Sequence, residues 1–232
     1  MASINHNPIR LLNFVKSAIL KPGTVVRKAP IGLLAGINLE IDFATQTQLY
    51  LGLYETETFS FLRRAARRAK WMIDVGAGAG ELSLFFMRDH GRNTVFAVEP
   101  SEAARAVLAR NLAANGWTSD DIVIASAFAG ADAAEGVVRL DDFAVAPEAP
   151  GLVKIDVDGF EVDVLNGTRR ILSTRAADFL VEVHSVELEA ECVSILKGHG
   201  YQVDVIPNAW WRLVVPENRP IAHNRWISAS VC

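Results

Sequence analysis

Short apolar stretches alternate with segments of helical spacing along most of this chain, and no other feature constrains its fold as strongly. Strands that are joined through helices pair in parallel, and a parallel sheet needs helices on both faces. The alternation therefore predicts a doubly wound, Rossmann-like α/β sheet, mostly parallel, with an antiparallel strand at its β-rich end. The predicted strands are 71–75, 94–98, 122–125, 152–156, 179–183, 201–206, 211–215 and 225–229, and the predicted helices are 59–70, 81–90, 102–115, 160–172 and 186–197.

The first 45 residues do not follow this alternation. Apolar residues recur at helical spacing from Ile9 to Ile19 and predict a helix that ends at Pro22-Gly23, and two short apolar stretches, 24–26 and 37–43, predict a hairpin. We expect residues 1–45 to be an extension that caps a main domain of residues 46–232. Its basic residues suit a solvated face, with contact to a membrane surface as the alternative: Arg10, Lys16, Lys21, Arg27 and Lys28.

Composition excludes several classes of protein. Half of the residues are hydrophobic, which excludes a disordered chain, and the net charge of −4 argues against a dedicated nucleic-acid binder. Cys192 and Cys232 are too few for a disulfide scaffold and fit a reducing, cytoplasmic compartment. The longest uncharged stretch, 43–54, is too short and polar to span a bilayer, and Asn13 and Lys16 interrupt the apolar run that a secretory signal needs.

A glycine-rich loop follows the predicted strand 71–75, where open α/β sheets bind ligands. A dinucleotide fingerprint requires its third glycine where Glu81 stands, and a carboxylate at a helix start repels a pyrophosphate. The loop therefore favours a nucleoside without phosphates, and the positive end of S-adenosylmethionine suits a nearby carboxylate. We expect this cofactor to contact Asp74, Gly76, Ala77, Gly78 and Gly80.

The next two predicted strands supply the other cofactor contacts. Glu99 follows strand 94–98 and is placed to accept both ribose hydroxyls, with Pro100 and Ser101 beside it. Ser126 and Ala127 follow strand 122–125 and would line an adenine slot. A tight turn with a helix-start acid that binds no cofactor is the alternative.

The predicted strand 152–156 is unusual because charged residues interrupt it. Lys154, Asp156 and Asp158 alternate with apolar residues and so lie on one side of the strand as it leaves the sheet. Glu182 and His184 repeat this pattern on strand 179–183. Buried charges are costly, which favours a functional role, although a structural ion pair of Lys154 with Asp156 or Glu182 is the alternative.

These motifs together resemble the FkbM family of S-adenosylmethionine-dependent methyltransferases. The resemblance runs from Leu53 to His184, with a looser echo at His223-Asn224, through the segments DVGAGAGELSLFF, AVEPS, RLDDF, VKIDVDGFEVDVLNG and LVEVH. Two positions depart from the family pattern: Ala79 replaces an Asn, and Asp158 replaces a Glu.

The resemblance implies a class I methyltransferase domain with a seven-stranded sheet, and methylation of a hydroxyl on a sugar or secondary metabolite. It also implies that Glu55 closes over the methionine end of the cofactor, a solvated helix-start acid being the alternative. The family feature Asp141-Asp142 receives no chemical role.

Methyl transfer to an aliphatic hydroxyl benefits from a base that takes its proton. His184 is the predicted base because its ordinary pKa lies nearest neutral pH. Asp156 is the second candidate, and it would otherwise bind the acceptor hydroxyl or the methionine amine. Lys154 would lower a neighbouring pKa or hold an acceptor oxygen, while Glu161 and Glu182 would orient these groups or bind sugar hydroxyls.

Three alternatives stay open at this point. We expect no metal, yet Asp156, Asp158, Glu182 and His184 would also suit a divalent ion. The acceptor atom would alternatively be a nitrogen of a peptide or amino sugar, or the protein a non-catalytic cofactor-binding module. We expect a small hydroxylated acceptor and no nucleic-acid partner, and a homodimer is left open.

Two further clusters are assigned mainly to structure. A basic helix face suits a solvated helix end, because no aromatic residues are interleaved for base stacking: Arg63, Arg64, Arg67, Arg68 and Lys70. A late aromatic group would pack in the core or at the sheet edge, with one or two members lining the acceptor pocket: Trp210, Trp211, His223 and Trp226.

Overall fold

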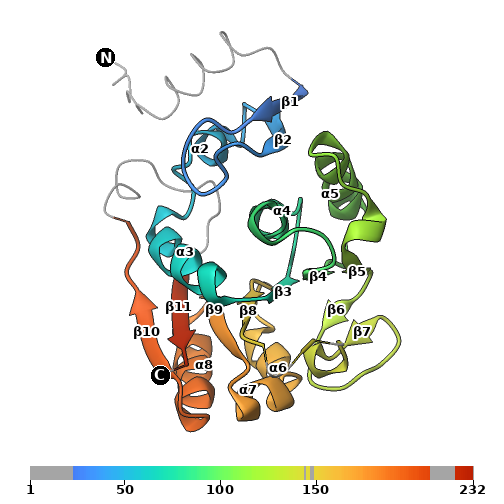
Figure 1. Cartoon of the computed structure of the whole chain (residues 1–232). Helices are drawn as coiled ribbons and strands as arrows, with labels where there is room; N and C mark the ends of the chain where they lie inside the picture. Colours follow the sequence, from blue (N-terminus) through green and yellow to red (C-terminus); the bar gives the residue numbers. More distant parts are fainter. Residues whose placement is uncertain (1–22, 144, 147–148, 210–222, 232) are drawn as a thin grey trace, which may run out of the picture.

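A seven-stranded sheet lies at the centre of the computed structural model, which describes residues 23–143, 145–146, 149–209 and 223–231 (Figure 1). The strand order is β10-β11-β9-β8-β3-β4-β5. β11 runs antiparallel to both of its neighbours, whereas β9, β8, β3, β4 and β5 pair in parallel. The predicted doubly wound α/β fold with an antiparallel strand is therefore confirmed. The strands of this sheet are β3 (Trp71–Val75), β4 (Val95–Val98), β5 (Val123–Ala125), β8 (Gly151–Ile155), β9 (Ala177–Val183), β10 (Gln202–Ile206) and β11 (Arg225–Ser230).

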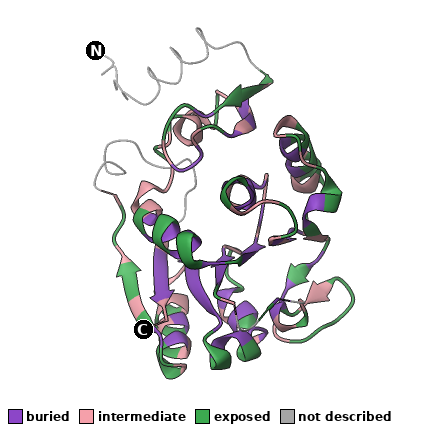
Figure 2. Ribbon diagram, in the orientation of Figure 1, coloured by how far each residue is buried: buried purple, intermediate pink, exposed green. Residues whose placement is uncertain are grey.

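Helices cover both faces of the sheet, and Figure 2 shows the buried strands between them. Side chains of α3, α4 and α5 form one core with Met72 and Leu152, while those of α6, α7 and α8 form the other with Ile73 and Val153. None of the helices in the described ranges is both long and apolar enough to cross a membrane. The helices are α2 (Thr47–Tyr50), α3 (Phe59–Arg68), α4 (Glu81–His90), α5 (Glu102–Ala114), α6 (Glu161–Asn166), α7 (Arg169–Thr174) and α8 (Val186–Gly198), with 3-10 turns η1 (Thr56–Thr58), η2 (Ser119–Asp121) and η3 (Leu140–Asp142).

The predicted hairpin near the N-terminus is present as β1 (Thr24–Lys28) and β2 (Asn38–Asp42), which pair antiparallel. Its buried residues Leu39 and Ile41 join the core on the α4 and α5 side. The hairpin is fixed to α5 because the Asn111 amide oxygen accepts the backbone N–H of Glu40 at 2.7 Å. The predicted helix between Ile9 and Ile19 lies outside the described residues, and the division at residue 45 stays a prediction.

The single helix predicted over 160–172 is wrong, because the chain forms two short helices, α6 and α7, in its place. The break follows Gly167, which packs against a neighbouring turn so closely that a Cβ atom there would lie 2.0 Å from the carbonyl oxygen of Gly130. A contact between residues so far apart in the chain leaves no signal in local helical spacing.

Asp141 explains why α7 begins where it does. Its two carboxylate oxygens accept the backbone N–H groups of Arg170 at 2.7 Å and Ile171 at 3.1 Å, which caps the helix start. Its neighbour Asp142 pairs with Arg139 at 2.6 Å on the surface. The Asp-Asp feature therefore has a structural role here. Two short strands, β6 (Phe128–Ala129) and β7 (Val137–Val138), pair in parallel as a separate ribbon.

Candidate functional site

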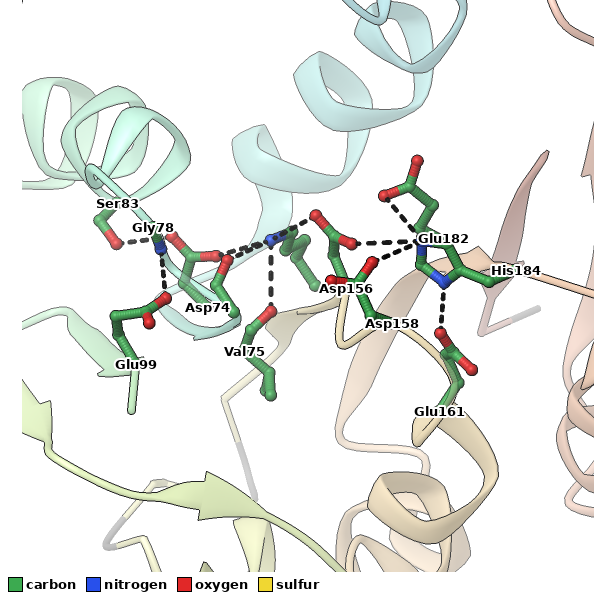
Figure 3. A network of polar contacts seen from close by, with 12 residues as sticks. Asp74, Val75, Gly78, Ser83, Glu99, Asp156, Asp158, Glu161, Glu182 and His184 are labelled. Atoms are coloured by element: carbon green, nitrogen blue, oxygen red, sulfur yellow. Dashed lines mark hydrogen bonds and ion pairs between the residues drawn. The ribbon is translucent and has the colours of Figure 1, made fainter. Parts of the chain in front are cut away.

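The predicted site residues gather where β3, β4, β8 and β9 end. Parallel strands bring their carboxyl ends to one edge of the sheet, which is where α/β proteins bind ligands. In Figure 3 a network of polar contacts runs along this edge, from Glu99 and Gly78 at one end to His184 and Glu161 at the other. The structure thus brings together both motifs that the sequence singled out.

The glycine loop after β3 has left-handed backbone at two positions that matter. Gly76 has φ of 70°, and a Cβ atom there would lie 1.9 Å from the carbonyl oxygen of Asp156, so only glycine lets the loop reach the end of β8. Gly78 has φ of 56°, and a Cβ atom on it would meet nothing within 4 Å. The backbone at Gly78 therefore faces open space that a ligand can enter.

Glu99 joins the glycine loop to the end of β4. It is buried, and its carboxylate oxygens accept the backbone N–H groups of Gly78 and Ser101, each at 2.8 Å. Ser101 also caps α5, since its side chain accepts the backbone N–H of Ala104. Arg105, which sequence reasoning missed, donates to the carbonyl oxygens of Glu99 at 2.8 Å and Pro100 at 2.6 Å. These bonds hold the acid in place before any ligand binds.

Asp74 is buried in the sheet beneath the loop. Its carboxylate accepts the hydroxyl of Ser83 at 2.6 Å and lies 3.6 Å from the ammonium of Lys154 on the neighbouring strand. Ser83 was not predicted, although a serine on the apolar face of a helix is a signal for a buried hydrogen bond. Asp74 is therefore tied to both α4 and β8.

Lys154 occupies the middle of the network. Its ammonium donates to the carbonyl oxygens of Gly76 at 2.7 Å and Val75 at 3.2 Å, and it lies 3.5 Å from the carboxylate of Asp156. Burial alone would lower the pKa of Lys154, but the Asp156 and Asp74 carboxylates outweigh it and raise that pKa above its ordinary value. The structural ion pair that the sequence left open is thus present, and a catalytic role for Lys154 stays a prediction.

His184 directly follows β9 and contacts several acids. Its Nδ1 atom forms a 2.6 Å hydrogen bond with the fully buried carboxylate of Glu161 at the start of α6. Its Nε2 atom faces carboxylate oxygens of Asp158 at 3.4 Å, Glu182 at 3.8 Å and Asp156 at 3.9 Å. The hydrogen bond to Glu161 is the main cause that raises the pKa of His184 above its ordinary value. We call these five residues the His184 cluster.

Glu182 and Glu55 belong to the same edge. Burial, followed by the neighbouring Asp156 carboxyl, raises the pKa of Glu182 well above its ordinary value. Glu55 lies at the start of η1 and is close enough that its charge contributes to raising the pKa of both Glu182 and Lys154. Glu55, which the family resemblance selected, therefore lies near the network. Its closure over a cofactor stays a prediction.

The predicted adenine slot lies beyond β5. Ala127 is buried, Ser126 is exposed, and β5 is fixed to the Glu99 end because Ala125 accepts the backbone N–H of Glu99 at 3.1 Å. Phe128, which the sequence analysis did not select, is 63% exposed directly after this pair. The sequence could have drawn attention to Phe128, because it is an aromatic residue next to the predicted nucleoside slot.

The basic helix face and the late aromatic group have structural contacts where the structure describes them. The arginines of α3 are exposed, and Arg68 lies 3.7 Å from Asp178, as expected for a solvated face. Trp226 is buried in β11, and His223 contacts Glu189 at 3.1 Å. The expected packing role is therefore confirmed for Trp226, while Trp210 and Trp211 lie outside the described residues.

Comparisons with known proteins agree with these observations. Residues 45–137 match the precorrin methyltransferase domain, and residues 125–203 match the methyltransferase FkbM domain. The curated protein 31-O-demethyl-FK506 methyltransferase FkbM from Streptomyces tacrolimicus is 37% identical over 111 residues, which are 45% of this chain and 43% of that protein. The chain thus matches less than half the length of that relative.

Similar folds occur among solved methyltransferases. FkbM from Methylobacillus flagellatus superposes with a TM-score of 0.55 at 18% identity, over 70% of this chain and 44% of its own. A SAM-dependent O-methyltransferase from Thermotoga maritima gives 0.50 at 17% identity, over 77% and 66%. The Pyrococcus abyssi tRNA (uracil-54, C5)-methyltransferase gives 0.52 at 13% identity, over 90% and 44%. At these identities the likeness shows the fold, that of a Rossmann-like methyltransferase. The FkbM domain match over residues 125–203 and the curated relative agree with the predicted resemblance to the FkbM family.

Proposed function

We propose that this protein transfers the methyl group of S-adenosylmethionine to a hydroxyl oxygen of a small acceptor, a sugar or a secondary metabolite. The observation that carries the proposal is that the glycine loop and the His184 cluster adjoin at one edge of the sheet (Figure 3). Lys154 donates to the carbonyl oxygen of Gly76 in the loop and contacts Asp156 of the cluster. The name of the FkbM relative, a methyltransferase that acts on an O-demethyl compound, supports oxygen as the acceptor atom.

The residues at the glycine loop fit the cofactor. Each carboxylate oxygen of Glu99 accepts one backbone N–H and has a lone pair left for a ribose hydroxyl. Gly78 leaves open space where the nucleoside would pass. Asp74 lies beneath the loop, where it is tied to Ser83 and Lys154. When bound, S-adenosylmethionine supplies an electrophilic methyl group on a good leaving group.

The His184 cluster would receive the acceptor. Because the sulfonium is already activated, much of the acceleration comes from holding the acceptor oxygen in line with the methyl group. A hydroxyl must also lose its proton to a nearby base. The candidate groups at this edge are the imidazole of His184 and the carboxylates of Asp156 and Asp158, which lie within 4.8 Å of one another. His184 stays the predicted base and Asp156 the second candidate.

The other acceptor and partner hypotheses remain weaker. A binding module without turnover has no use for a histidine whose ring is fixed by a buried glutamate and whose second nitrogen faces the ligand edge. No contact among the described residues favours a nitrogen acceptor over an oxygen acceptor. The absence of a nucleic-acid partner, a homodimer and a cytoplasmic location stay predictions.

Calorimetry on the full chain tests the cofactor assignment. We expect S-adenosylmethionine and its demethylated product to bind in the micromolar range, and NAD not to bind. Gly78→Val should abolish this binding, because a β-branched residue resists a positive φ and fills the open space. Gly116→Val is the matched control, since Gly116 has φ of 78° and open space around it but lies after α5. Tight NAD binding, or equal loss in both variants, would overturn the assignment.

The acceptor itself is found by incubating the protein with the cofactor and candidate hydroxylated compounds and recording a mass increase of one methyl group. Methylation at a nitrogen in a compound that offers both atoms would contradict the proposed oxygen acceptor.

A further inference from the structure

Three side chains of the His184 cluster point their ligand atoms at one another. Asp156 and Asp158 follow β8, and His184 follows β9. One atom from each of these side chains lies within 4.8 Å of the other two. In Figure 3 the carboxylates of both aspartates are directed toward the same nitrogen of the imidazole.

Buried polar atoms without partners point to a ligand at this place. The His184 side chain is 8% exposed, and its Nε2 atom has no hydrogen-bond partner among the described residues. The Glu182 side chain is 2% exposed, and its Oε2 atom, 3.8 Å from Nε2, likewise has none. An unpaired buried polar atom is costly, so a ligand that satisfied both atoms would be favoured.

The imidazole is oriented as a metal ligand is. Glu161 accepts the Nδ1–H group at 2.6 Å, and its own position is fixed because the same oxygen accepts the backbone N–H of Gly159 at 2.9 Å. A carboxylate on one ring nitrogen sets the tautomer and directs the lone pair of the other outward. In the neutral ring, Nε2 therefore presents its lone pair to the aspartates.

We propose that Asp156, Asp158 and His184 bind a divalent metal ion, with Glu182 as a fourth ligand. A set of carboxylates with one imidazole suits Mn²⁺ and ions like it better than Mg²⁺ or Ca²⁺, which prefer oxygen alone. Ligand atoms about 2.2 Å from an octahedral ion lie roughly 3 to 4.4 Å apart. The distances of 3.4 to 3.9 Å from Nε2 to the three carboxylates fall in that range.

The role given to the ion in the reaction rests on the proposed function, whereas the binding of the ion does not. A metal ion at this position would bind the acceptor hydroxyl and lower its pKa, so the activating group would be the ion in place of the imidazole base. Metal binding itself requires neither cofactor nor acceptor, and it is measured without them.

The test uses the full chain, freed of metal by a chelator and kept without cofactor. Mn²⁺ is titrated in, and electron paramagnetic resonance measures the concentration of the ion that stays free. We expect one Mn²⁺ per chain. His184→Ala should abolish this binding and Asp158→Asn should weaken it by at least tenfold. Asp158 is a side chain 79% exposed with φ of 43°, a conformation that asparagine tolerates, so this variant keeps the fold if His184→Ala does not. Asp142→Asn removes an exposed carboxylate away from the site and should bind Mn²⁺ as the unaltered chain does.

Absence of stoichiometric Mn²⁺ binding, or binding that is equal in Asp158→Asn and in the unaltered chain, would overturn the metal site. Calorimetry with S-adenosylmethionine on the same metal-free sample separates the two proposals. Cofactor binding without Mn²⁺ binding removes the metal and leaves the proposed function, whereas Mn²⁺ binding without cofactor binding supports the metal site and removes the function.

Discussion

The two ends of the polar network differ in how completely the protein satisfies them. At the Glu99 end, backbone N–H groups of Gly78 and Ser101 occupy the carboxylate, and Arg105 fixes the loop behind it. At the His184 end, Nε2 and the Oε2 atoms of Glu161 and Glu182 lack hydrogen-bond partners among the described residues. The first end is therefore preorganised, while the second is incomplete until a ligand arrives. A cofactor grip needs the former, and a place where bonds change needs the latter.

Replacing His184 with alanine should have the largest effect, and it should affect one end alone. We expect turnover to fall by about 10² to 10⁴-fold, because a group that activates the acceptor hydroxyl contributes on that scale. Cofactor affinity should change little, since the acids that contact His184 follow β8 and β9 and are not part of the glycine loop. Initial rates with an identified acceptor and calorimetry with the cofactor check this. Unchanged turnover would remove His184 from the reaction, and lost cofactor binding would show that the two ends are not separable.

Replacing Lys154 with methionine should weaken both ends, because it leaves Asp74 and Asp156 without their shared cation. Removing one partner of a buried ion pair costs about 3 to 5 kcal/mol, and a chain of this size loses roughly 2 to 4 °C in Tm per kcal/mol. We expect a fall of about 10 °C in thermal unfolding. Arg139→Met is the control, since Arg139 pairs with Asp142 on the surface and should leave Tm unchanged. Equal Tm values for both variants would show that Lys154 does not hold the network together.

Replacing Glu99 with glutamine should weaken the cofactor end by an intermediate amount. The amide keeps the size of the side chain but loses one acceptor, so it cannot serve both backbone N–H groups and both ribose hydroxyls. We expect cofactor affinity to fall by about tenfold to a hundredfold, equivalent to about one hydrogen bond to a charged group. Mn²⁺ binding should be retained, which a parallel titration measures. A loss of Mn²⁺ binding as large as that of cofactor binding would contradict two independent ends.

Replacing Glu161 with glutamine should change the His184 end alone, because Glu161 acts through His184. We expect Mn²⁺ affinity to fall by about tenfold to a hundredfold, as for other residues that orient a metal-bound histidine. Glu161 is a positioning residue, so the NMR signals of the His184 ring should also shift in this variant without metal. If the ring signals and the Mn²⁺ affinity both stay unchanged, the imidazole is oriented by other contacts.

Elements with continuous local patterns could be predicted well from the sequence. β3 and α4 begin and end at the predicted residues, because an apolar stretch broken only by Asp74 defines β3 and flanking glycines define α4. The split between α6 and α7 could not be predicted, since it depends on Gly130 and on Asp141 from elsewhere in the chain. The break arises from packing and capping between segments that are separate in sequence.

The site shows the same division. Residues at strand ends were selected correctly as neighbours because parallel strands bring their carboxyl ends to one edge. Their pairing was not predictable, since the distance between His184 and Glu161 depends on how α6 packs against β9. Ser83 and Arg105 were missed because each acts on a predicted residue from a helix that the motifs did not include.

The central claim is that a nucleoside with a sulfonium binds between Glu99 and the His184 cluster. A crystal structure of the chain with S-adenosylhomocysteine and Mn²⁺ tests it most directly. We predict ribose hydroxyls on the Glu99 carboxylate, the nucleoside passing Gly78, and the sulfur directed toward the edge at which the ion is bound by Asp156, Asp158 and His184. A nucleoside bound elsewhere, or one whose sulfur faces away from that edge, would contradict the account.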